Sequence, residues 1–274
     1  MTAAVQAPRA AAAPNRGSYW ARYRHALWLL TTRDLKVRYT TSALGYLWSI
    51  IDPLLMALIY FVVFTYVFQH RGGTAAQPYI VFLLCAVLPW TWFNGNLSDA
   101  TRAFRQEGKL IRSVRIPRSI WILRQIASKG IEFVISLSIL AFFALISGAA
   151  PSPLLPVYLV VAIALQVLLT VGCNFIIAPL AVFYRDLERI VKLGLRVMFY
   201  AAPVLYHPDF GNPVLHFLYG INPLAGILDL YRGMFFPEIV DWVYVIQSLI
   251  GSLVLFAIGA VVFRRSIPRV LKEI

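Results

Sequence analysis

Residues 33–53 read Arg-Asp-Leu-Lys-Val-Arg-Tyr-Thr-Thr-Ser-Ala-Leu-Gly-Tyr-Leu-Trp-Ser-Ile-Ile-Asp-Pro. Charged side chains fill the start of this stretch, hydroxyl side chains and a glycine follow, and a mainly apolar run then continues to Phe68 with one charge, Asp52. Lys and Arg favour the cytoplasmic flank of a membrane span, whereas Trp and Tyr favour its interface. The stretch therefore predicts a chain that passes from a basic aqueous face into lipid, although any first span with basic flanking residues has this gradient.

The composition of the chain is that of a membrane protein. Of its 274 residues, 60% are hydrophobic and only 14% are charged, whereas a soluble domain has about 25% charged residues. Several apolar runs reach the roughly 20 residues that cross a bilayer as a helix. We therefore expect an all-α integral membrane protein with six transmembrane helices.

The net charge of +13 is distributed in clusters. Lys and Arg gather before residue 50, at 102–129, at 185–196 and after residue 263, and these clusters alternate with the apolar runs. This alternation is what orientation by the positive-inside rule requires. The basic excess thus predicts contact with anionic lipid headgroups rather than with nucleic acid.

No residue pattern predicts catalysis, a metal site or a bound cofactor on this chain. Cys85 and Cys173 each lie alone in an apolar run, and the four histidines are scattered, so neither a disulfide framework nor a metal site is expected. No Gly-x-x-x-x-Gly-Lys-Ser/Thr motif occurs, since Gly108-Lys109 lacks both the earlier glycine and the following hydroxyl. ATP must therefore bind to another chain.

Apolar runs, prolines and charges divide the chain in order. A cytoplasmic tail is expected at 1–17, an amphipathic interface helix at 18–32, a transmembrane domain at 33–263 and a basic cytoplasmic tail at 264–274. Residues 215–236 are interrupted by Pro223 and contain two charges, so they predict two short re-entrant or interfacial helices on the outer side. The six spans, which put both termini in the cytoplasm, are expected at about 44–68, 78–100, 120–147, 155–184, 190–206 and 242–263.

Four stretches in the same order resemble one family. They are Arg-Asp-Leu-Lys-x-Arg-Tyr with Ser-x-Leu-Gly-x-x-Trp at 33–54, Leu-Ile-Arg-Ser-Val-Arg-Ile-Pro-Arg at 110–118, Phe-Tyr-Arg-Asp-Leu-Glu-Arg-Ile at 183–190, and Asn-Pro-Leu-Ala-Gly-Ile-Leu-Asp-Leu-Tyr-Arg-Gly at 222–233. From residue 18 onward the chain resembles the ABC-2-type permeases, and within them the branch that exports O-antigen, capsule, teichoic acid and cell-wall galactan.

The resemblance implies half of an exporter in a bacterial inner or plasma membrane. Two copies of the permease would pair with two ATPase subunits that bind ATP and Mg²⁺, and a glycan linked to polyprenyl diphosphate would pass between the permeases. An O-antigen and an actinobacterial galactan both remain open as substrates. The loop at 101–118 would hold a coupling helix against the ATPase, and the segment at 185–189 would make a second contact. The residues implied in coupling are Leu110, Ile111, Arg112, Val114, Arg115, Ile116, Pro117, Arg118, Arg185, Asp186 and Arg189.

The substrate path is predicted from side-chain chemistry. Aromatic side chains with polar tips suit both sugar rings and membrane interfaces, so an interfacial aromatic belt is the alternative. We expect Asp52, Tyr60, Tyr200 and Tyr206 to face the pore. The outer gate implied by the resemblance would contain Asn222, Pro223, Asp229 and Arg232, of which the last two are three residues apart and can pair on one helix.

Three other classes of protein compete with this interpretation. A secondary transporter should have repeated halves and several buried carboxylates, but only Asp52 clearly qualifies. A membrane glycosyltransferase or ligase needs paired acid and base groups, and the external carboxylates are few. An ABC-2 exporter of a small molecule or drug shares the architecture and is the closest alternative.

Overall fold

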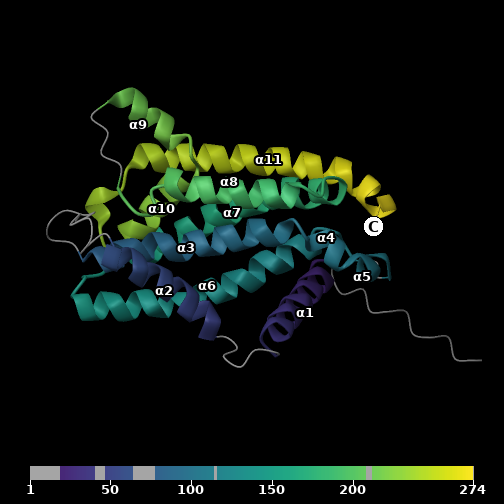
Figure 1. Cartoon of the computed structure of the whole chain (residues 1–274), viewed down its shortest axis with the longest axis horizontal. Coiled ribbons are helices and arrows are strands. Elements are labelled where there is room, and N and C mark those ends of the chain that lie inside the picture. Colours follow the sequence, from purple (N-terminus) through teal and green to yellow (C-terminus); the bar gives the residue numbers. More distant parts are fainter. Residues whose placement is uncertain (1–18, 41–46, 64–77, 114–115, 208–211, 274) are drawn as a thin grey trace, which may run out of the picture.

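The computed structural model describes residues 19–40, 47–63, 78–113, 116–207 and 212–273. Every regular element within these ranges is helical (Figure 1). In chain order the elements are α1 (Tyr19–Thr40), α2 (Trp48–Val62), α3 (Tyr79–Ala100), α4 (Ala103–Gln106), α5 (Gly108–Ser113), α6 (Ile120–Ser147), α7 (Leu155–Phe183), α8 (Leu187–Ala201), α9 (Pro213–Gly220), α10 (Leu224–Gly233), the 3-10 helix η3 (Pro237–Ile239) and α11 (Trp242–Glu273).

Four helices in the described ranges are long and apolar enough to cross a bilayer, namely α3, α6, α7 and α11. Helices α9 and α10 meet at a bend of 93° and would add a fifth crossing if they form one broken span. Four of the six predicted spans thus coincide with helices of sufficient length and hydropathy, and those at 44–68 and 190–206 stay predictions. Their helices, α2 and α8, have 15 described residues each, fewer than the roughly 20 that cross the hydrocarbon core. Residues 64–68 lie outside the described part of the chain.

Helix α3 is the centre of the bundle. It contacts α2, α6, α7, α8 and α10, and most of its side chains are buried. Trp92 stacks on Phe133 of α6 with ring centroids 4.9 Å apart. Gln166 of α7 donates a hydrogen bond to the Pro89 carbonyl at 2.8 Å. Apolar packing and a buried polar contact thus fix α3 between its neighbours.

Helices α7 and α11 pack closely because two glycines meet at their crossing. A Cβ atom on Gly172 would lie 2.6 Å from the backbone nitrogen of Phe256, and a Cβ on Gly259 would lie 2.3 Å from the Gly172 carbonyl oxygen. Both distances are far below ordinary contact and involve backbone atoms. Small residues allow helix backbones to approach one another in membrane bundles, so this pair sets the spacing between α7 and α11.

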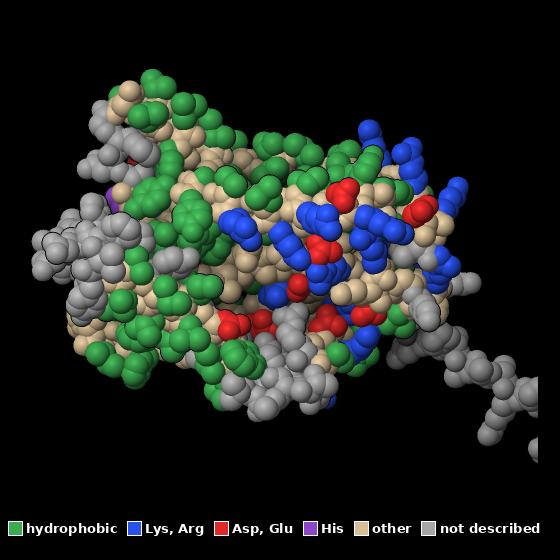
Figure 2. All heavy atoms as spheres, viewed as in Figure 1, with side chains coloured by type: hydrophobic (Ala, Val, Ile, Leu, Met, Phe, Trp, Pro, Cys, Tyr) green, Lys and Arg blue, Asp and Glu red, His purple; other side chains and the backbone are tan. Residues whose placement is uncertain are grey.

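Charged side chains gather at one end of the molecule. In Figure 2, Lys, Arg, Asp and Glu cover the end that carries α4, α5 and the C-terminus of α11, while hydrophobic side chains dominate the other. We call the first the charged end and the second, which carries α9 and α10, the apolar end. Helix α3 ends at the charged end and α8 begins there.

Three helix boundaries differ from the sequence prediction. Helix α1 continues to Thr40 instead of ending at 32, and α11 continues to Glu273 instead of ending at 263. Charged segments were interpreted as the ends of helices, but Arg and Lys are good helix formers and both helices pass through them. Helix α8 ends at Ala201 because Pro203 follows within two residues, and proline favours an extended residue before it.

Candidate functional site

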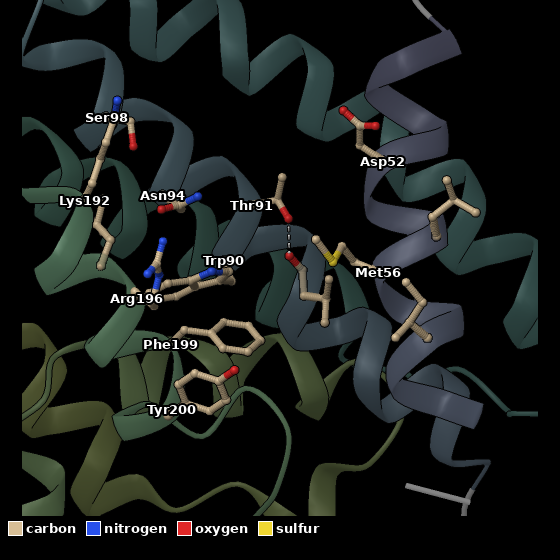
Figure 3. A pocket seen from close by; sticks show the side chains of 14 residues that line it. Asp52, Met56, Trp90, Thr91, Asn94, Ser98, Lys192, Arg196, Phe199 and Tyr200 are labelled. Carbon is tan, nitrogen blue, oxygen red and sulfur yellow. Dashed lines mark hydrogen bonds between the residues drawn. The ribbon is translucent and has the colours of Figure 1, made fainter. Parts of the chain in front are cut away.

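A cleft of about 840 Å³ opens between α2, α3 and α8 (Figure 3). Its volume is within the range of about 300–1,000 Å³ that ligand pockets occupy. Because α3 runs toward the charged end and α8 runs away from it, the last residues of α3 face the first residues of α8. The cleft therefore extends from the charged end toward the apolar end.

The wall that α3 contributes is polar. Thr91, Asn94 and Ser98 line it, and their spacing of three and four residues puts them on one helix face. The Thr91 hydroxyl donates to the Val87 carbonyl at 2.8 Å, so only its lone pairs are available to a ligand. The Trp90 ring lies beside them and packs on Phe199, with ring centroids 5.4 Å apart.

The wall that α8 contributes is cationic and then aromatic. Lys192 and Arg196 line the cleft one helical turn apart, and Phe199 and Tyr200 follow in the next turn. Leu195 is buried, whereas Tyr200 is 63% exposed. One helix therefore presents two positive charges to the cleft nearer the charged end and two aromatic rings beyond them.

The wall that α2 contributes is apolar apart from one carboxylate. Asp52 faces the cleft across from Lys192 and Arg196 (Figure 3), and Leu55, Met56 and Ile59 continue the same wall. Within the described ranges no ion pair involves Asp52. An ionisable group in a membrane protein normally faces a protein interior or water, which is consistent with its place in this cleft.

The four residues predicted for the substrate path are not all in one place. Asp52 and Tyr200 line the cleft together, while the side chain of Tyr60 lies outside the described part of the structure. Tyr206 lies beyond the cleft, where its hydroxyl donates to the Tyr200 carbonyl at 3.2 Å and accepts a hydrogen bond from the Tyr219 hydroxyl at 3.1 Å. Tyr206 therefore connects the end of α8 to α9.

At the charged end, Arg124 of α6 joins three segments. Its guanidinium is 3% exposed and lies 2.8 Å from an Asp34 carboxylate oxygen on α1 and 3.1 Å from a Glu107 carboxylate oxygen just before α5. Arg33 reaches the same Glu107 oxygen at 3.2 Å but is 43% exposed. The guanidinium of Arg124 also lies over the Trp121 ring, 4.8 Å from its centroid. These five residues form what we call the Arg124 cluster.

The loop at 101–118 is attached to two further helices. Arg105 donates hydrogen bonds to the carbonyls of Ala181 and Tyr184 at the C-terminus of α7, where cations are favoured. Arg102 pairs with Glu188 of α8. Hydrogen bonds from Arg102 and Lys192 lower the pKa of Glu188 to about 2. The two segments that the resemblance implies in coupling therefore lie side by side.

The predicted coupling residues differ in exposure. Ile111 is fully buried within this subunit, so it anchors α5 rather than forming its outer surface. Val114 and Arg115 lie outside the described residues, and Asp186 occupies the N-cap of α8 without a capping hydrogen bond from its side chain. The exposed members are Arg112, Arg185, Asp186 and Arg189, and the partly buried ones are Leu110, Ile116, Pro117 and Arg118.

Near the apolar end, Asp229 and Arg232 of α10 are both fully buried, and their nearest charged atoms are 3.8 Å apart. The Arg232 guanidinium also lies 3.8 Å from the centroid of the Phe82 ring and donates to the carbonyls of Pro203 and Val204. Arg232 therefore fastens the segment after α8 to α10 and α3. In the turn before α10, the Asn222 side chain accepts a hydrogen bond from the Leu224 amide at 3.1 Å, and Pro223 is partly buried.

Sequence reasoning missed three charged residues that the structure places at the Arg124 cluster and in the cleft. Arg124 was counted in the basic cluster at 102–129, and Lys192 and Arg196 in the one at 185–196, and both clusters were interpreted as orienting the chain. A charge inside a predicted span is itself a signal, but its partners come from distant segments. Among the described residues, no group of His, Cys, Asp or Glu side chains is arranged to hold a metal ion.

Comparison with known proteins agrees with this geometry. The family model described as ABC-2 type transporter matches residues 25–236. An O-antigen export system permease protein RfbA of Klebsiella pneumoniae is 33% identical over 86% of this chain and 90% of its own length. An O-antigen export system permease protein RfbA of Myxococcus xanthus is 29% identical over 79% and 82%, and a polysialic acid transport protein KpsM of Escherichia coli is 21% identical over 86% and 91%. The chain therefore belongs to the ABC-2 type transporter family.

Proposed function

We propose that this chain is the permease subunit of an ATP-driven exporter that moves a lipid-linked polysaccharide across a bacterial inner or plasma membrane. The observation that carries the proposal is 33% identity to an O-antigen export permease over 86% of the chain. The apolar helices are consistent with a membrane protein. The cleft is consistent with transport, because charged and polar side chains line it between α2, α3 and α8. The proposal covers both an O-antigen and a cell-wall galactan as the substrate.

In the proposed assembly the charged end faces the cytoplasm, since Lys and Arg concentrate on that side of membrane proteins. Helices α2 and α8 provide the first and fifth of six spans, and α9 and α10 form the outer gate. Both termini are then cytoplasmic, and two copies of the chain enclose the path.

ATP and Mg²⁺ bind to two partner ATPase subunits in this proposal. The exposed cations of the loop at 101–118 and of the segment at 185–189 contact the ATPase, and Ile111 holds α5 in place from inside. Because the Arg124 cluster joins this loop to α1 and α6, movement of the ATPase is transmitted to the membrane helices.

The test combines depletion of the protein with purification. On depletion, lipid-linked glycan should accumulate on the cytoplasmic side of the membrane, and tagged protein should co-purify with an ATPase subunit. Arg112→Glu reverses an exposed charge on α5 and should reduce the amount of ATPase that co-purifies, whereas Arg265→Glu on α11 is the matched control. If depletion leaves glycan export intact while an ATPase still co-purifies, the polysaccharide proposal is wrong and the result favours the small-molecule exporter.

A further inference from the structure

Two cations on α8, Lys192 and Arg196, line the cleft within the first three turns of the helix. Arg196 lies nine residues after the first residue of α8, which is about 13 Å along a helix with a rise of 1.5 Å per residue. It lines the cleft together with Lys192. In the proposed assembly α8 is the fifth span, and a cation that only marked the end of that span would lie at the start of the helix; the position of Arg196 therefore calls for another explanation.

The charge of this pair is only partly balanced. Lys192 lies 2.8 Å from Glu188, but Glu188 is shared with Arg102. In the described ranges no ion pair involves Arg196. The α8 wall therefore has a net positive charge. The Arg196 guanidinium on this wall can form two parallel hydrogen bonds to a phosphate group.

The neighbouring side chains suit a sugar next to a phosphate. Asn94 and Ser98 face the two cations from α3 (Figure 3), and their amide and hydroxyl groups can both donate and accept hydrogen bonds. One turn beyond Arg196, the exposed ring of Tyr200 offers an apolar face with a polar tip. On the opposite wall, the Asp52 carboxylate can accept hydrogen bonds from sugar hydroxyls. Its negative charge repels a phosphate from the α2 wall and so favours binding of the phosphate at the α8 wall.

We propose that Lys192 and Arg196 form the anion subsite of this cleft and hold the phosphate groups of a phosphate-linked glycan lipid. The first sugar then lies between Asn94 and Tyr200, toward the apolar end. This inference rests on the proposed function and assigns the residues that hold the reducing end of its substrate. Bulk anionic lipid has the same phosphate chemistry, so the test must separate the two sources.

The experiment measures binding to the full-length permease with its co-purified ATPase in nanodiscs of phosphatidylcholine. The probe is radiolabelled farnesyl diphosphate that carries one N-acetylglucosamine, and the matched uncharged ligand is farnesyl N-acetylglucosaminide. Arg196→Gln should weaken binding of the probe about tenfold or more, the effect expected when a hydrogen bond to a charged group is lost. Lys192→Gln should have a smaller effect on probe binding, because the Lys192 ammonium group already forms an ion pair with Glu188.

Two comparisons distinguish a subsite from general changes. Arg265→Gln removes one exposed positive charge from a side chain that does not line the cleft, and this variant should bind the probe like the wild type. The uncharged ligand should bind equally to the wild type and to Arg196→Gln, and a fall in its binding would instead show that the cleft has changed shape. If Arg196→Gln does not fold, Lys192→Gln and Arg196→Lys still test the pair, since both should weaken probe binding.

Three results would overturn the inference. One is unchanged probe binding in Arg196→Gln and in Lys192→Gln. Another is equal weakening of the uncharged ligand. The third is displacement of the probe by phosphatidylglycerol as effectively as by unlabelled probe, which would make this a site for bulk lipid. If the wild type binds the probe but the variants do so equally, only the subsite is wrong; if the wild type does not bind it and depletion leaves glycan export intact, the proposed function is wrong.

Discussion

Replacing Arg124 by methionine should destabilise the protein more than any change at a neighbouring surface cation. The substitution keeps a long side chain but leaves the Asp34 and Glu107 carboxylates without their shared partner. Removing one partner from a fully buried ion pair costs about 3–5 kcal/mol because a charge is left unpaired. Here Arg124 is 3% exposed but the two carboxylates are 17% and 18% exposed, so the lower limit of about 3 kcal/mol applies.

Thermal unfolding in detergent or nanodiscs measures this effect. At roughly 2 °C or more per kcal/mol for a chain of this size, Tm should fall by about 6 °C. Arg33→Met is the matched control, because Arg33 contacts the same Glu107 oxygen but is 43% exposed. Exposed ion pairs contribute at most about 1 kcal/mol, so its Tm should fall by no more than about 2 °C.

A triple variant separates the unpaired charge from lost packing. Arg124→Met combined with Asp34→Asn and Glu107→Gln removes all three charges, and neutral replacement of a buried ionic group is often tolerated. Its Tm should recover most of the loss seen in Arg124→Met. Equal Tm values for Arg124→Met and Arg33→Met, or a triple variant less stable than Arg124→Met, would refute this account of the Arg124 cluster.

Three other predictions follow from the packing and charges. Gly172→Ala should destabilise the protein by about 1–3 kcal/mol through overpacking, because the new Cβ meets backbone of α11 at 2.6 Å; thermal unfolding measures it. Asp229→Ala should lower the free energy of unfolding by about 3 kcal/mol or more, since it leaves the charge of the buried Arg232 without a carboxylate partner. Thermal unfolding measures this loss as a lower Tm. Glu188 has a pKa of about 2, below its ordinary value of 4.5, so its contacts stabilise the folded state at neutral pH. This contribution should be lost as the pH falls from about 4.5 to 2, and the Tm difference between the wild type and Glu188→Gln should shrink over that range.

Each of these predictions has a control within the same fold. Gly194→Ala is matched to Gly172→Ala, because a Cβ at Gly194 meets nothing within 4 Å, and equal losses in the two would contradict the account of the α7–α11 crossing. Glu238→Ala is the control for Asp229→Ala, because Glu238 is exposed and an exposed ionic contact contributes at most about 1 kcal/mol. A Tm difference for Glu188→Gln that stays constant between pH 7 and pH 3 would contradict the ionic account.

The bounds of the long apolar helices α3, α6 and α7 could be predicted from sequence to within one residue, whereas only the presence of the short helices, and not their bounds, could be predicted. The predicted span at 120–147 coincides with α6, and those at 78–100 and 155–184 differ from α3 and α7 by one residue at one end. In these segments hydrophobic length alone determines the helix. At α8 and α10, in contrast, charged residues interrupt the apolar pattern, and their helices depend on partners such as the Pro203 carbonyl, which no local pattern reveals.

The candidate site was predicted only in part for the same reason. Asp52 and Tyr200 were chosen for their chemistry, and both line the cleft. Lys192 and Arg196 were missed because a basic cluster near the end of a span is explained equally well by membrane orientation. Only the packing of α8 against α3 shows that these two side chains face inward to the cleft rather than outward to headgroups.

The position of Glu188 links the cleft to the loop at 101–118. Its carboxylate contacts Arg102 in that loop and Lys192 in the cleft, and it lies one helical turn before Lys192. A displacement of the loop that separates Arg102 from Glu188 leaves the whole negative charge of the carboxylate to Lys192. The positive charge offered to a ligand in the cleft then falls, because Lys192 is more fully neutralised while Arg196 is unchanged. If Lys192 and Arg196 hold an anion as proposed, the same contact that attaches the loop to α8 would make the affinity of the cleft for that anion depend on the position of the loop.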